Sequence, residues 1–149
     1  MSTDETVTRD LVKTLENGRE GFEKASKKLM ESNEPQIAET FAGFARDRVR
    51  MSAELTALAG SYGDIVQEGS TPAGAIHRGW MAVKDGLSGH DAKGVLDAAA
   101  QGEDHAVQEY ERASHEDLSP GLREVVTRQM ADVTSARDHV RTLQETHAR

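Results

Sequence analysis

The chain has 149 residues and a formal net charge of −8 at pH 7, and it contains no cysteine. Its length fits a single domain over residues 1–149, and the acidic excess argues against a nucleic-acid partner and against docking on an anionic membrane. The absence of cysteine excludes disulfides, thiolate metal ligands and a cysteine nucleophile. The polar first ten residues are not typical of a signal peptide, and no apolar run reaches the roughly 18 residues that span a bilayer. We therefore expect a cytoplasmic protein.

Two long helices are predicted in the first half of the chain, over residues 4–31 and 34–59. In both, apolar or small residues recur at alternating steps of three and four, the spacing of a helix-bundle seam. In the first helix they are Leu11, Leu15, Gly18, Phe22, Ala25 and Leu29. In the second they are Ile37, Phe41, Phe44, Arg48, Met51, Leu55 and Leu58, of which only Arg48 is charged. Asn33 is expected to cap the second helix, with Pro35 in its first turn.

A shorter helix is predicted over residues 72–87, followed by long helices over 91–117 and 120–146. The short helix contains "HRGW", in which we expect His77 and Trp80 to be structural, with Trp80 buried against the end of the bundle. The inward positions of the last two helices are Val95, Ala99, Gly102, Ala106, Tyr110 and Ala113, then Leu122, Val126, Gln129, Val133, Ala136, Val140 and Leu143. No stretch alternates as a strand does, so the predicted fold class is all-α.

Two short strings each occur twice, in the same order. "GFEKAS" (21–26) is similar to "EYERAS" (109–114), and "ARDRVR" (45–50) is similar to "ARDHVR" (136–141). Chance matches among helix-favouring residues are one explanation. The simpler one is an internal pseudo-repeat of two αα-hairpins, packed together as a four-helix bundle.

Longer strings resemble a known family. They are "ENGREGFEKAS" (16–26), "GSTPAGAIHRGWMAVKDGLSGHD" (69–91), "QGEDHAVQEYERA" (101–113) and "RQMADVTSARDHVRTL" (128–143). These strings are similar to a bacterial family of ferritin-like four-helix-bundle proteins of unknown function. The resemblance implies a ferritin-like bundle whose two hairpins are joined by a long crossover containing the short helix. It implies little about activity.

A di-metal centre of the ferritin type would need a Glu from each of two helices and a Glu-x-x-His pair from each of the other two. The chain contains no Glu-x-x-His, and the predicted inward seams contain no Asp, Glu or His. At mid-bundle they offer Gly18, Arg48, Gly102 and Gln129, and we expect Arg48 and Gln129 to be structural. We therefore predict no metal and no cofactor.

If a site exists, iron or another divalent metal would bind acidic and histidine side chains on the borders of the seams. The candidates are Glu20, Glu54, Glu103, Asp132 and His139. For each of them, the alternative is a solvated or salt-bridged surface residue.

The arginines suggest ion pairs. An inward Arg48 needs an internal carboxylate, and Arg48→Met is expected to be tolerated if that carboxylate stays hydrated. The pairs Arg46-Asp47 and Arg137-Asp138 recur with the hairpins, and we expect a mixture of buried ion clusters, held by Glu23 or Glu111 of the partner arm, and ordinary surface pairing.

No catalytic residues are predicted, because the chain lacks the Gly-x-Ser-x-Gly and phosphate-binding glycine motifs. We expect a non-enzymatic bundle protein that acts through protein association, as a homodimer or with an unknown protein partner. The resemblance adds a stress-related role. The alternative function is a metal-carboxylate protein that binds or oxidises iron.

Overall fold

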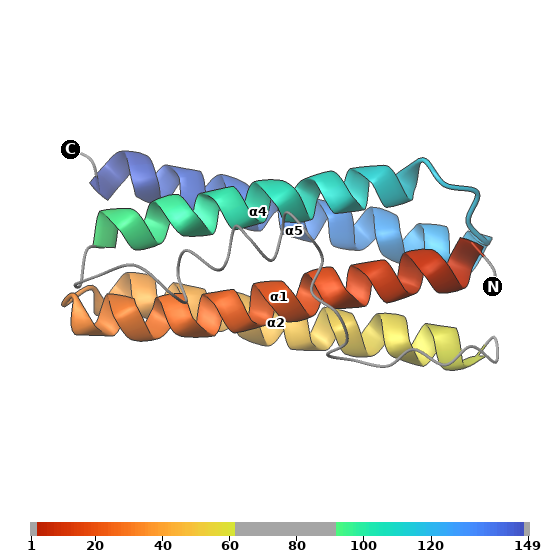
Figure 1. Cartoon of the computed structure of the whole chain (residues 1–149), viewed down its shortest axis with the longest axis horizontal. Helices are drawn as coiled ribbons and strands as arrows, with labels where there is room; N and C mark the ends of the chain where they lie inside the picture. Colours follow the sequence, from red (N-terminus) through yellow and green to blue (C-terminus); the bar gives the residue numbers. More distant parts are fainter. Residues whose placement is uncertain (1–2, 62–91, 148–149) are drawn as a thin grey trace.

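The computed structural model of the chain describes residues 3–61 and 92–147, which form four long α-helices and no strand (Figure 1). The helices are α1 (Thr3–Glu31), α2 (Pro35–Ser61), α4 (Ala92–Ser114) and α5 (Pro120–His147). The prediction of an all-α chain is therefore confirmed for these ranges. The predicted helix over 72–87, with His77 and Trp80, lies outside the described residues. None of the four helices is long and apolar enough to cross a membrane.

The helices pack side by side as a four-helix bundle. α1 is antiparallel to α2, and α4 is antiparallel to α5 (Figure 1). The neighbouring pairs are α1 with α2, α4 with α5, α1 with α4, and α2 with α5. Consequently α2 and α4 lie diagonally across the bundle axis. They run in the same direction, so α2 ends and α4 begins at opposite ends of the bundle.

The turn between α1 and α2 corrects the predicted role of Asn33. Its φ is 62°, in the left-handed region that asparagine tolerates better than most residues. The N–H of Glu34 donates to the carbonyl of Leu29 at 2.9 Å, and that of Asn33 donates to Met30 at 3.2 Å. This pattern terminates a helix, so Asn33 closes α1 and does not cap α2. Pro35 is the first residue of α2, as predicted.

α4 ends at Ser114, whereas the sequence predicted a helix as far as Asp117. The next two N–H groups bond to carbonyls three residues back, which tightens the turn. The guanidinium of Arg123 then donates to the carbonyls of Ser114 and Glu116, at 3.1 and 2.6 Å. These bonds satisfy carbonyls that would otherwise need a further helical turn.

Two apolar clusters form the core of the described part of the chain. One surrounds Leu11, Leu55 and Tyr110, and the other surrounds Phe22, Phe41 and Leu96. The predicted inward positions of α1 and α4 are all buried. The buried stripe of α4 is wider than predicted, because it also includes Leu96, Glu103 and Val107. This greater width follows from the two neighbours of α4, since the helix packs against both α1 and α5.

Phe22 should be one of the most sensitive core positions. Its side chain is fully buried, and its ring lies 5.1 Å from that of Phe41, edge to face, and 5.2 Å from that of Phe44. Phe22→Ala should therefore lower the free energy of unfolding by about 3–5 kcal/mol, as measured by urea denaturation. Met30, which is 57% exposed, provides the control. If Phe22→Ala lowered the free energy of unfolding no more than Met30→Ala does, the packing described for Phe22 would be wrong.

Candidate functional site

Arg48 of α2 and Glu103 of α4 form a buried ion pair across the bundle axis. The Nη1 and Nη2 groups of Arg48 donate to Oε1 and Oε2 of Glu103, at 2.9 and 2.5 Å. The side chains are only 2% and 0% exposed. Charge-assisted pairs with two parallel hydrogen bonds are stronger and more directional than neutral hydrogen bonds. Arg48 thus has the internal carboxylate partner that the sequence predicted.

The pair lies between the two apolar clusters, at the level of Gly18 on α1. A Cβ at Gly18 would lie 2.6 Å from Nη1 of Arg48, which is closer than real Cβ contacts. Glycine is therefore needed here so that the guanidinium can approach the backbone of α1. The guanidinium carbon also lies 5.2 Å from the ring centroid of Phe22, within the range of a cation–π interaction.

Arg48 keeps its charge in this interior. Burial lowers the pKa of Arg48, but the charge and hydrogen bonds of Glu103 raise it, and the net shift is upward. An ion pair of this kind contributes little net stability relative to well-packed hydrocarbon. Removing one partner lowers the stability strongly, because it leaves the other charge buried without compensation.

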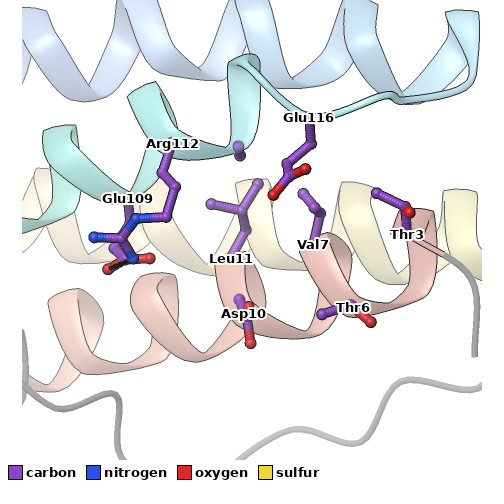
Figure 2. A pocket seen from close by; sticks show the side chains of 9 residues that line it. Thr3, Thr6, Val7, Asp10, Leu11, Glu109, Arg112 and Glu116 are labelled. Carbon is purple, nitrogen blue, oxygen red and sulfur yellow. Dashed lines mark hydrogen bonds and ion pairs between the residues drawn. The ribbon is translucent and has the colours of Figure 1, made fainter.

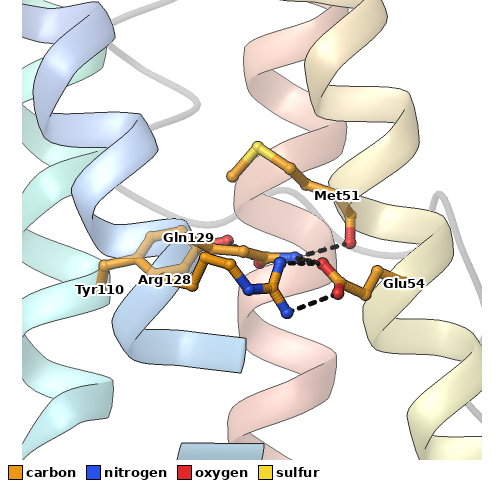
Figure 3. Close-up of polar contacts among 5 residues, drawn as sticks. All are labelled: Met51, Glu54, Tyr110, Arg128 and Gln129. Carbon is orange, nitrogen blue, oxygen red and sulfur yellow. Dashed lines mark hydrogen bonds and ion pairs between the residues drawn. The ribbon is translucent and has the colours of Figure 1, made fainter. Parts of the chain in front are cut away.

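A second polar layer is centred on the buried side chain of Gln129 (Figure 3). The hydroxyl of Tyr110 donates to Oε1 of Gln129 at 2.7 Å. The Nε2 group of Gln129 donates to the carbonyl of Met51 at 3.1 Å and to Oε1 of Glu54 at 2.9 Å. One amide therefore links α5 to both α4 and α2. Burial raises the pKa of Tyr110, so its hydroxyl stays protonated and remains a donor.

Glu54 connects this layer to the surface. Arg128 donates two hydrogen bonds to its carboxylate, at 3.0 and 2.6 Å. These bonds, together with that from Gln129, outweigh desolvation and lower the pKa of Glu54. The Arg128 and Glu54 side chains are 49% and 36% exposed, so solvent screens the pair and it adds little stability.

The structure does not bring the five metal-ligand candidates together at one site, although Asp132 and His139 line one groove between α2 and α5. Glu20 is exposed on α1, Glu54 is paired with Arg128 and Glu103 with Arg48, while Asp132 and His139 are exposed on α5. Over residues 3–61 and 92–147, no three His, Asp or Glu side chains come together in a way that could hold a metal. The prediction that the inward seams contain no acid is wrong at Glu103, which belongs to the wider buried stripe of α4.

The centre of the bundle does not fit a di-metal cofactor. Such a site needs several inward carboxylates and imidazoles. Among the described residues, Glu103 is the one fully buried carboxylate, and both of its oxygens accept hydrogen bonds from Arg48. A fixed guanidinium at this point would also repel a second cation.

A groove of about 210 Å³ between α2 and α5 reaches Arg48 from outside. Asp132 and His139 line it, together with Asp47 and Arg50, which pair with each other at 3.0 Å. The imidazole of His139 lies edge to face with the ring of Phe44, at 5.6 Å. The groove therefore brings acidic, basic and aromatic groups together, without a dominant charge.

Of the two interpretations for Arg46 and Arg137, the structure supports surface pairing, because neither arginine forms a buried cluster with Glu23 or Glu111. Arg46 contacts Glu39 at 3.3 Å, and Arg137 contacts its neighbour Asp138 at 3.1 Å. Glu23 pairs instead with Arg19, one turn away on the same helix. The Arg46 and Arg137 side chains are 68% and 21% exposed, and each pairs with a residue of its own helix. They are ordinary surface pairs of small energetic value.

Breaking the central pair should be costly. Arg48→Met should lower the free energy of unfolding by about 3–5 kcal/mol, because Glu103 would remain buried without a partner. The sequence-based expectation that this change is tolerated applied only if the partner carboxylate stayed hydrated, and Glu103 is fully buried. The double variant Arg48→Met with Glu103→Leu should regain most of the loss in chemical denaturation. A double variant no more stable than Arg48→Met would contradict this account.

Comparison with known proteins shows which family the chain belongs to. No curated protein and no solved structure matches the chain. Residues 5–116 match the family described as "Domain of unknown function (DUF2383)". The match covers α1, α2, α4 and both partners of the central ion pair, and it ends before α5. Because it spans well over half of the 149 residues, the chain belongs to this family of unknown function.

Proposed function

We propose that the protein is a non-enzymatic helical bundle of ferritin-like type, which acts in the cytoplasm through association with other chains. The observation that carries the proposal is the ion pair between Arg48 and Glu103 at the bundle centre. A guanidinium and its carboxylate use the volume in which a ferritin-like protein would place metal ligands. A stress-related role rests on the resemblance to ferritin-like proteins alone.

The topology supports the ferritin-like part of this proposal. In the described residues, α2 and α4 run in the same direction, and α2 ends at the opposite end of the bundle from the start of α4, as in ferritin-like folds. We propose that the predicted short helix, residues 72–87, belongs to a crossover between the two hairpins.

Burial patterns support part of the internal repeat. Phe22 and Tyr110, which correspond in the two copies, are both fully buried. The second element agrees less well, because Val49 is 49% exposed while its counterpart Val140 is buried. We therefore propose that the hairpins share an origin and that their second arms have diverged.

We propose the exposed surface around Val49, formed by α2 and the adjoining side of α1, as the surface for a second copy of the chain. Val49 is one of two large hydrophobic residues exposed in the described ranges, and it borders a hollow of about 280 Å³. Ser26, Ala42 and Ala45 line this hollow, with Glu23 and Arg46 beside them. A protruding valine beside a hollow of small residues can pair with itself about a twofold axis.

Metal analysis tests the proposed absence of a metal centre. Protein purified from cells grown with iron should contain almost no bound metal per chain, and a chelator should leave its thermal stability unchanged. Glu103→Ala should make no difference to metal content. A ratio of about two metals per chain, lost in Glu20→Ala or Glu103→Ala, would support the iron-binding alternative instead.

Light scattering after size-exclusion chromatography tests the dimer. The wild-type protein should have twice the chain mass of 16.2 kDa, and Val49→Asp should reduce it to one chain mass. Met30→Asp, at the other exposed hydrophobic residue, is the matched control and should remain dimeric. A monomeric wild type, or a dimer that survives Val49→Asp, would rule out this surface.

A further inference from the structure

A second groove, of about 240 Å³, lies between the start of α1 and the end of α4 (Figure 2). Its floor is apolar, because Val7, Leu11 and Ala113 line it and are themselves almost fully buried. In Figure 2, Val7 and Leu11 lie in the middle of the group, with the acidic side chains of Asp10, Glu109 and Glu116 around them. The groove thus combines a hydrocarbon floor with an acidic rim.

The charges of the rim are unbalanced. Arg112 is the one basic residue that lines the groove, and its Nη1 group donates to Glu109 at 2.8 Å. The side-chain carboxylates of Asp10 and Glu116 form no hydrogen bond or ion pair with the described residues, since only their backbone carbonyls accept bonds. Three lining carboxylates face one lining guanidinium, and Arg123, which donates to the carbonyl of Glu116, adds a second cation beside the rim. The groove stays negative by one charge, on a chain whose net charge is −8.

The partial charges at the helix ends do not make the groove positive. α1 begins beside the groove and contributes a partial positive charge, while α4 ends beside it and contributes a partial negative one. Asp4 and Glu5, in the first turn of α1, offset the positive end further. The side-chain charges therefore determine which ligands the groove attracts.

The geometry points to a binding site for an aliphatic diamine or a longer polyamine. Its methylene chain would lie over Val7 and Leu11, which are only 7% and 1% exposed, so charge pairing rather than burial of apolar surface would supply the selectivity. Its ammonium groups would pair with Asp10 and Glu116, which lie on opposite helical hairpins. A neutral ligand would leave both carboxylates unpaired, and an anion would be repelled. This inference uses neither the central ion pair nor the surface around Val49, so it is independent of the proposed function.

Calorimetric titration with cadaverine tests the site, with pentylamine and pentanediol as ligands of matched length. Cadaverine should bind about three- to tenfold more tightly than pentylamine, and pentanediol should not bind measurably. Added salt should weaken the binding of cadaverine. Amide shifts in NMR should be confined to the start of α1 and the end of α4. Equal affinities for cadaverine and pentylamine would overturn the inference.

A pair of double variants separates this groove from general surface charge. Asp10→Asn with Glu116→Gln should lower the affinity for cadaverine about three- to tenfold. Glu111→Gln with Asp117→Asn removes the same charge from adjacent exposed positions that do not line the groove, and should change the affinity less than about twofold. All four positions are exposed, so both variants should keep the wild-type circular dichroism spectrum. Equal losses in the two variants would mean non-specific attraction and would refute the site.

Discussion

A guanidinium that is withdrawn from water at the centre of a helical bundle constrains everything around it. Arg48 must meet a carboxylate with both of its outer nitrogens, and Glu103 supplies it from the diagonal helix. The side chain also needs room, which the missing Cβ of Gly18 provides. Three helices are thereby held in one register at this level. Sliding α2 or α4 by one turn would separate two buried charges, which is a strong penalty against alternative packings.

The hydrogen bonds of Gln129 fix the position of the fourth helix, α5, in the same way. A buried amide that bonds Tyr110 on α4 and the backbone of α2 leaves α5 little freedom to rotate or slide. Hydrocarbon clusters on both sides supply the driving force for packing, but such clusters tolerate many arrangements. The polar layers therefore specify which arrangement forms.

Much of the fold could be predicted from the sequence, because the three-and-four spacing of apolar residues directly reports the buried side of each long helix. The unusual Arg48 on that side correctly implied an internal carboxylate. Its identity was missed because a single narrow seam was assumed for α4, which placed Glu103 at the border. Glu103 directly follows Gly102, a residue assigned to mid-bundle, and that proximity could have identified it. An inward Gln129 likewise implied partners, but the hydroxyl of Tyr110 could be chosen only once the helices were placed in space.

The central claim is that Arg48 is fixed in the interior by Glu103, and NMR of the arginine side chains tests it most directly. The Nη protons of Arg48 should give separate, slowly exchanging signals at neutral pH, because both groups are bonded and shielded from water. Those signals should broaden or disappear in Glu103→Gln, while exposed Arg50 should be unaffected in either protein. Nη protons of Arg48 that exchange with solvent as fast as those of Arg50 would contradict the account.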